Sequence, residues 1–226
     1  MSGDAAGRTP RIAVVYGALR SGTTLLRLML DAHPRIACPG ESDWLFDHLV
    51  ADGAGGWRLD RAELAADRVF RAAGIALPAG AEGAAAVRAM AGALAAGRAG
   101  PLVLMTHRHP GRVLEIFPGA PVIHLLRDPR DVARSAIGMG WAGTVYHGLD
   151  TWLGTERAWD AVAPALAPGQ ALTLTYEALI RAPEAALSRA AAHLGEAWDP
   201  AMLSYDRSTT YAAPDPALGE QWRRRL

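Results

Sequence analysis

The sequence predicts an α/β fold, a three-layer sandwich with a central parallel sheet of about four to five strands. Short apolar runs that suit buried strands alternate with longer segments in which apolar residues recur at helical spacing. Strands that alternate with helices usually form a parallel sheet with helices on both faces. In such sheets ligands bind beyond the carboxyl ends of the strands, so the loops that follow the strands are the first candidates for a functional site.

Each predicted element rests on composition and on signals at its ends. The expected strands are apolar and rich in β-branched residues or leucine, and cover residues 11–16, 101–105, 121–126 and 171–175. The expected helices cover residues 23–32, 42–51, 60–73, 81–96, 128–137, 149–162 and 183–194. Asp128 is a good N-cap, and Pro183 and Gly195 mark the start and end of the last helix. We expect one domain over residues 1–226, because no repeat or linker interrupts the pattern.

Composition argues against some classes of partner. The formal net charge is +0, whereas a general nucleic-acid or membrane-surface binder needs an excess of basic residues. The chain has no lysine, so any phosphate group must be held by arginine side chains, backbone amides and hydroxyl groups.

Several features predict a cytoplasmic protein without a membrane span. The one cysteine, Cys38, cannot form an intrachain disulfide. Residues 1–10 are polar, lack the apolar core of a signal peptide and are expected to be disordered. The Ala-rich segment 84–100 is interrupted by Arg88 and Arg98, and is too polar to cross a bilayer.

The loop after the first predicted strand has the spacing of a phosphate-binding P-loop. Gly17 and Gly22 enclose four residues, and G-x4-G loops point successive backbone N–H groups at an anion held at a helix N-terminus. A nucleotide triphosphatase needs a lysine next, whereas position 23 is threonine and the cation comes earlier, at Arg20. A loop of this kind can still grip one terminal anion. The alternative is a plain turn from strand to helix.

A resemblance to a known family rests on this loop. Sulfotransferases that use 3'-phosphoadenosine-5'-phosphosulfate (PAPS) have a 5'-phosphosulfate loop similar to Arg20, Ser21, Gly22, Thr23, Thr24 and Leu25. The longer run 20–41 resembles the opening of tyrosylprotein sulfotransferases and their bacterial relatives. The resemblance implies a P-loop-type fold and an enzyme that moves a sulfuryl group from PAPS to an acceptor hydroxyl or amine, with no metal required. It also implies that residues 20–24 hold the 5'-phosphate and the departing sulfonate.

A second motif follows the third predicted strand. Arg127 stands at the strand end and Ser135 lies two turns into the next helix, so both can converge on one phosphate. The alternative is a capped helix with solvated arginines. Sulfotransferases carry an R-[DN]-x-[KR]-D-x-x-x-S motif here, and Arg127 and Ser135 match the pair that binds the 3'-phosphate in that family. After the fourth strand, Tyr176 resembles a family tyrosine near the adenine, and a core tyrosine at a strand end is the alternative.

The acceptor must lose a proton during transfer, and the sequence offers two candidate bases. Glu41 matches the position of the catalytic glutamate of tyrosylprotein-type enzymes, and His107 matches the catalytic histidine of cytosolic small-molecule sulfotransferases. The alternatives are a helix-entry acid for Glu41 and an exposed loop histidine for His107. Many relatives have lysine where this chain has Met105, which leaves Arg20 or Arg108 to stabilise charge at the transferring group.

The acceptor itself is not named by the sequence. We expect it between the helices of residues 42–97 and the aromatic segment 137–159, and a small molecule, a glycan or a lipid are all open. A homo-oligomer also remains open. The rival functions are a P-loop kinase, or a non-catalytic protein that binds PAPS or 3',5'-adenosine bisphosphate (PAP). The segment 222–225 resembles the part of relatives that closes over PAPS, in a C-terminus shorter than in many of them.

Overall fold

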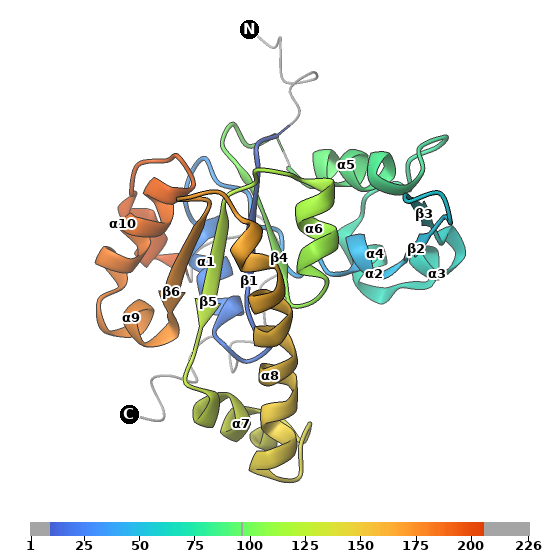
Figure 1. Ribbon diagram of the computed structural model, residues 1–226. Coiled ribbons are helices and arrows are strands. Elements are labelled where there is room, and N and C mark those ends of the chain that lie inside the picture. Colours follow the sequence, from blue (N-terminus) through green and yellow to red (C-terminus); the bar gives the residue numbers. More distant parts are fainter. Residues whose placement is uncertain (1–9, 96, 206–226) are drawn as a thin grey trace, which may run out of the picture.

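A computed structural model describes residues 10–95 and 97–205 of the chain, and confirms an α/β fold around a parallel sheet (Figure 1). The central sheet has four strands in the order β4-β1-β5-β6, and every neighbouring pair is parallel. The strands are β1 (Ile12–Tyr16), β4 (Leu102–Thr106), β5 (Val122–Leu126) and β6 (Ala171–Thr175). All lie within one or two residues of the predicted runs.

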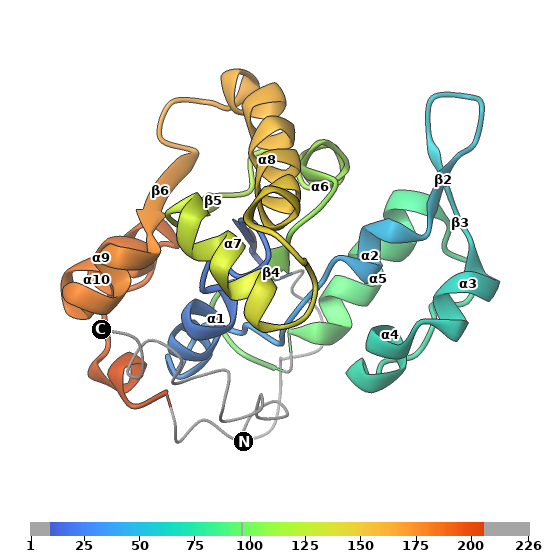
Figure 2. The same ribbon diagram turned by 90° about the horizontal axis from the view of Figure 1, so that it is seen from below.

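Helices cover both faces of this sheet and complete the three layers (Figures 1 and 2). Because successive side chains of a strand point to opposite faces, β1 contributes Val14 and Tyr16 to one core and Ala13 and Val15 to the other. The first core is closed by α5 (Gly83–Leu94), α6 (Pro110–Ile116) and α8 (Val145–Val162). The second is closed by α1 (Thr23–Asp31), α9 (Tyr176–Arg181) and α10 (Pro183–His193).

A lobe of small elements stands to one side of the sheet (Figure 2). It contains α2 (Trp44–Asp47), β2 (Leu49–Ala51), β3 (Trp57–Leu59), α3 (Arg61–Ala66), α4 (Arg68–Ala73) and α5. The predicted helix 42–51 is wrong beyond α2, because the chain turns at Asp52 into an antiparallel hairpin. Asp52 Oδ1 accepts hydrogen bonds from the amides of Ala54 and Gly56, which stabilises the turn.

Other differences from the prediction also have local causes. The expected helix 60–73 is divided at Asp67, whose backbone is extended and whose side chain caps α4 through the amides of Val69 and Phe70. The short helices α6 and α9 and the 3-10 turns Ala163–Ala165 and Pro200–Leu203 were not predicted, since elements this short carry little periodic signal. The expectations for residues 1–9, and for the segment 222–225, lie outside the described residues.

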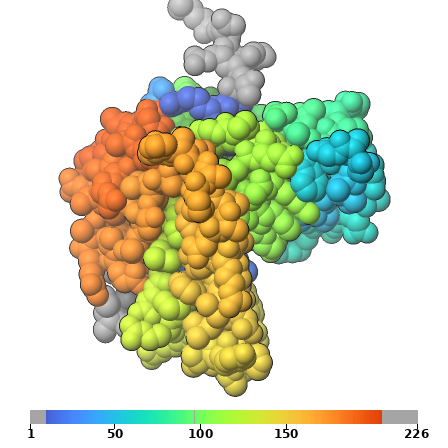
Figure 3. Space-filling model, viewed as in Figure 1, coloured from blue at the N-terminus to red at the C-terminus, as the bar shows by residue number. Residues whose placement is uncertain are grey.

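The sheet order fixes where a ligand can bind. The chain passes from the inner strand β1 to β4 on one side and then to β5 on the other, which creates a switch point at the carboxyl ends of these strands. Helix α7 (Pro129–Gly138) and the start of α8 project beyond the same edge of the sheet (Figures 1 and 3). Among the helices of the described residues, none is long and apolar enough to span a membrane.

Candidate active site

The loop after β1 is held against its neighbours by two glycines. A Cβ on Gly17 would lie 2.5 Å from the carbonyl oxygen of Leu125, so the loop starts in direct contact with β5. A Cβ on Gly22 would lie 2.2 Å from Cδ2 of Tyr176, and Gly22 also has a φ of +94°, which favours glycine. Both positions therefore require glycine. At Gly22, where the loop meets α1, the backbone packs directly against the Tyr176 ring.

Arg20 links this first loop to the motif after β5. Its Nε donates a hydrogen bond of 3.0 Å to Ser135 Oγ, and its carbonyl oxygen accepts one of 2.8 Å from Nη1 of Arg127. Its guanidinium carbon lies 5.5 Å from the centre of the Trp141 ring. Arg20 is also one of the described non-glycine residues with a positive φ, at 71°, a strained conformation that is common at functional sites.

The second motif places a cation on the same surface. Arg127 follows β5, and its guanidinium carbon lies 4.1 Å from the centre of the Tyr176 ring, at the start of α9. Asp128 caps α7 by accepting the amide of Arg130, and the hydrogen bond from the Arg130 side chain lowers the pKa of Asp128 to about 2. The cap directs α7 so that Ser135 faces Arg20 across the site. The residues predicted to bind a bisphosphate nucleotide are therefore neighbours in space.

Two buried polar atoms at this junction have the chemistry of an anion site. Within the described residues, Ser21 Oγ and Arg127 Nε are both buried and have no hydrogen-bond partner. A buried polar atom without a partner costs about 1–3 kcal/mol, so such atoms are rare in folded proteins unless they serve a ligand or a water. A hydroxyl and a guanidinium N–H both donate to phosphate oxygens, which fits the anionic ligand expected here.

Glu41 reaches the site through an extension of the sheet. The chain before it runs parallel to the outer edge of β4, where the Val103 amide donates to the Ala37 carbonyl and the Ser42 amide donates to the Met105 carbonyl, each at 2.8 Å. An isolated parallel bridge pairs Glu41 with Met105, two residues before His107. The side chain of Met105 is only 2% exposed and packs in the core on the α1 face.

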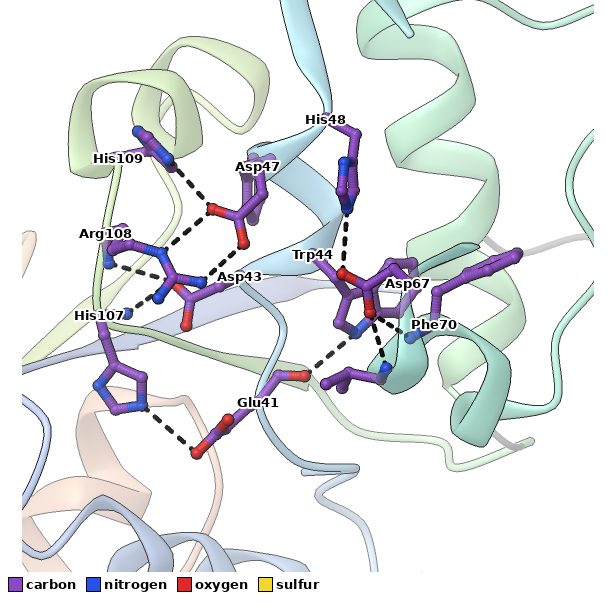
Figure 4. Close-up of polar contacts among 12 residues, drawn as sticks. Glu41, Asp43, Trp44, Asp47, His48, Asp67, Phe70, His107, Arg108 and His109 are labelled. Carbon is purple, nitrogen blue, oxygen red and sulfur yellow. Dashed lines mark hydrogen bonds and ion pairs between the residues drawn. The ribbon is translucent and has the colours of Figure 1, made fainter. Parts of the chain in front are cut away.

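His107 and Glu41, the two candidate bases, face one another (Figure 4). His107 Nδ1 lies 2.7 Å from the carbonyl oxygen of Gly17, and because a carbonyl only accepts, Nδ1 carries the proton. Nε2 is then the basic nitrogen of the neutral ring, and it lies 3.9 Å from Glu41 Oε1, too far for a hydrogen bond. The His107 side chain is 2% exposed and that of Glu41 is 61% exposed, so His107 is not the solvated loop histidine of the alternative interpretation.

The sequence interpretation missed Asp43, which is part of this arrangement. Asp43 Oδ1 accepts hydrogen bonds from the backbone amides of His107 and Arg108. The local signal was an acidic residue at a helix start, which is common on protein surfaces and gave no reason to link Asp43 with a loop after β4. The aromatic segment is divided: Trp159 is in the core against Tyr16, whereas Trp141 and Tyr146 are 57% and 75% exposed.

The residues that gather here suit the binding of an anionic ligand and the removal of a proton beside it. In the part of the chain that the structure describes, no group of three or more His, Cys, Asp or Glu side chains could hold a metal ion.

Several known structures with similar folds are sulfotransferases. The sulfotransferase domain of the Synechococcus PCC 7002 olefin synthase matches with a TM-score of 0.69 and 23% identity, over 96% of this chain and 89% of that one. The mouse sulfotransferase SULT7A1, solved in complex with PAP, matches with a TM-score of 0.54 and 15% identity, over 97% of this chain and 79% of the mouse chain. At these identities the matches establish the fold.

Sequence comparisons establish the family. A Caenorhabditis briggsae protein, named as a candidate protein-tyrosine sulfotransferase, is 27% identical over 208 residues, which cover 86% of this chain and 69% of that protein. The model of the family described as "Sulfotransferase family" matches residues 10–200, which include both motif loops and both candidate bases. The chain belongs to the sulfotransferase family.

Proposed function

We propose that this protein transfers a sulfuryl group from PAPS to a hydroxyl or amine of a small molecule, a glycan or a lipid. The observation that carries the proposal is the junction of the two motif loops, where Ser21 Oγ and Arg127 Nε are buried and, among the described residues, have no hydrogen-bond partner. The facing pair Glu41 and His107 is joined to the first of these loops by the hydrogen bond between His107 Nδ1 and the Gly17 carbonyl. The PAP complex of the mouse relative supports the choice of nucleotide. The proposal keeps the cytoplasmic location that the single cysteine favours.

In this proposal the nucleotide is held by both loops. The backbone amides and hydroxyls of residues 21–24 would hold the 5'-phosphate and sulfonate at the N-terminus of α1, whose partial positive charge favours anions. Arg127 and Ser135 would hold the 3'-phosphate, since the Ser135 hydroxyl accepts from Arg20 and keeps its own proton to donate. Tyr176, fixed under Arg127, would lie beside the adenine. When bound, PAPS supplies an activated sulfonate and a bisphosphate leaving group.

The residues of the chain then contribute orientation and charge. Two phosphate subsites on rigid loops fix the position of a bound nucleotide, and orientation of this kind provides a large part of enzymatic rate enhancement. Arg20 lies between the subsites and is placed to stabilise negative charge that develops at the sulfonate. The chain has no lysine to share this role, so we expect arginine and backbone amides to carry it.

Glu41 is the proposed base. Its carboxylate is the exposed member of the facing pair, so an acceptor hydroxyl can reach it directly. His107 Nε2 faces the same carboxylate from the buried side, and because it carries no proton it can accept the proton that Glu41 takes from the acceptor. Both residues would therefore act in one proton-handling unit, with Glu41 in contact with the acceptor and His107 behind it.

A transfer assay tests the proposal. The purified chain is incubated with sulfur-labelled PAPS and a panel that contains 4-nitrophenol, a tyrosine peptide, a hexosamine and a hydroxyl-bearing lipid. We expect labelled product with at least one acceptor and loss of about 100-fold or more in Glu41→Gln, the usual size of a general-base contribution. The matched control is Glu184→Gln on α10, which should keep wild-type activity. Binding of PAP without transfer to any acceptor would instead identify a non-catalytic nucleotide-binding protein.

A further inference from the structure

We propose that Asp43 is a positioning residue: its buried carboxylate anchors the backbone of residues 107–108 so that His107 Nε2 faces Glu41. The inference rests on the proposed function for the role of the pair, while the anchoring itself is a structural claim that can be tested without activity. It adds to the site a residue whose side chain bonds to the loop after β4 and not to the two motif loops, as far as the described residues show.

The carboxylate of Asp43 bonds to the backbone of the loop after β4. Asp43 is 5% exposed, and its Oδ1 accepts hydrogen bonds from two consecutive amides, 2.9 Å from His107 N and 3.0 Å from Arg108 N. Asp43 occupies the N-cap position of α2, where an aspartate normally accepts from the first turn of its own helix. Its side chain makes no such bond within the described residues, and reaches across to a different segment instead.

The contact with Asp43 is the second of two hydrogen bonds that hold His107 in place. The backbone nitrogen of His107 is held by Asp43, and ring Nδ1 is held by the Gly17 carbonyl at the start of the phosphate loop. With two fixed points the ring has one orientation, and Nε2 is directed at Glu41. His107 is therefore bonded to the same loop that carries Arg20 and Gly22. This contact fixes the position of the Glu41–His107 pair relative to the proposed phosphate subsites.

A second carboxylate on α2 provides a natural comparison. Asp47, at the end of α2, contacts the next two side chains of the same loop: Arg108 Nη2 at 2.7 Å and His109 Nε2 at 3.1 Å (Figure 4). Asp47 is more exposed, with 24% of its side chain accessible, and within the described residues its carboxylate bonds to the side chains of Arg108 and His109 rather than to His107. A loss of the Asp47 carboxylate should loosen the exposed part of the loop and leave the His107 ring in place.

Charge and burial are consistent with an anchoring role. Burial raises the pKa of Asp43, while the neighbouring His107 and the hydrogen bond from its amide oppose that rise. The groups that face Asp43 are His107 and Arg108 on the loop and Asp47 on its own helix. An asparagine in place of Asp43 keeps an oxygen that accepts both amides and removes the charge, whereas alanine removes the acceptor. The two substitutions therefore separate the hydrogen bonds from the charge.

The experiment uses the full chain with ¹⁵N-labelled histidine, and follows the ring nitrogens of His107 by NMR, assigned with His107→Gln. In the wild type and in Asp43→Asn we expect a single tautomer with the proton on Nδ1. In Asp43→Ala we expect a mixture of tautomers, because the backbone anchor is lost, and Asp47→Asn should match the wild type. An unchanged ring signature in Asp43→Ala overturns the proposal.

The same variants are assayed with PAPS and 4-nitrophenol. Misplacement of a catalytic group by about 1 Å costs about 100-fold in rate, so Asp43→Ala should lose about that factor in kcat, with the Kd for PAP within about twofold of wild type. Asp43→Asn should keep most of the activity, and equal loss in both variants would overturn the proposal. If no variant turns over but the ring signature still depends on the acceptor oxygen at position 43, the anchoring is supported and the proposed transfer activity fails.

Discussion

Replacement of Gly22 by alanine tests how the phosphate loop is packed. A residue with a Cβ at a φ of +94° is strained by about 1–2 kcal/mol. The added Cβ would also lie 2.2 Å from Cδ2 and 2.8 Å from Cε2 of Tyr176, whereas carbon atoms in contact are usually about 3.5–4.0 Å apart. Forcing extra atoms into a packed site costs about 1–3 kcal/mol. We therefore expect Gly22→Ala to lower the free energy of unfolding by about 2–5 kcal/mol.

Thermal unfolding and calorimetric titration with PAP measure the two consequences. A loss of this size lowers Tm by about 4–20 °C in a chain of 226 residues. Because Arg127 stacks on the displaced Tyr176 ring, the affinity for PAP should fall as well.

Two further variants separate the causes. Gly119 has a φ of +76°, and a Cβ added there would have no neighbouring atom of the described chain within 4 Å, so Gly119→Ala should show the conformational cost alone. Gly22→Ala combined with Tyr176→Leu should recover part of the loss, because the clash is relieved. Equal destabilisation by Gly22→Ala and Gly119→Ala would refute the packing argument.

Three other predictions follow from single contacts. Burial raises the pKa of the Cys38 thiol, so Cys38 should react with a disulfide reagent only after unfolding, and fast reaction of the native protein at pH 8 would contradict its burial. Arg127→Lys keeps the charge but loses the planar stack on the Tyr176 ring, so PAP affinity measured by calorimetry should fall about 2–30-fold, with exposed Arg134→Lys as the unaffected control. Phe46→Ala removes a fully buried ring from the core and should lower the free energy of unfolding, measured by chemical denaturation, by about 3–5 kcal/mol. A loss below about 1 kcal/mol would contradict the close packing of Phe46.

The strands, and the positions of the loops that follow them, agree with the sequence prediction because their signals are local. Apolar β-branched runs define β1 and β5, and the loops after them contain glycine, arginine and hydroxyl residues at short, fixed spacing. Arg127 stands at a strand end and Ser135 lies two turns into the next helix, and in the structure each makes a hydrogen bond to Arg20.

The relation between Glu41 and His107 could not be predicted from local signals. Their contact depends on the pairing of residues 37–42 with the outer edge of β4, and that stretch contains Pro39 and Gly40 and has no strand pattern of its own. The sequence therefore left them as competing bases, whereas the structure places them face to face. Asp43 was missed for the same reason, because its partners are backbone amides of a distant loop.

The hairpin of β2 and β3 shows where helical composition misleads. Residues 42–51 combine an acidic start with leucine, tryptophan and phenylalanine, which favour an amphipathic helix. The Asp52 turn and the pairing of Leu49 with Leu59 override that preference after one helical turn. Tertiary contacts of this kind outweigh the small differences in intrinsic propensity.

Calorimetric titration of the purified protein with PAP, with and without magnesium and with ATP as the comparison, tests whether the two motif loops form a site for PAP. We expect micromolar binding of PAP that does not depend on magnesium, and much weaker binding of ATP. Magnesium-dependent binding of ATP with no affinity for PAP would contradict this expectation and would favour a P-loop kinase instead.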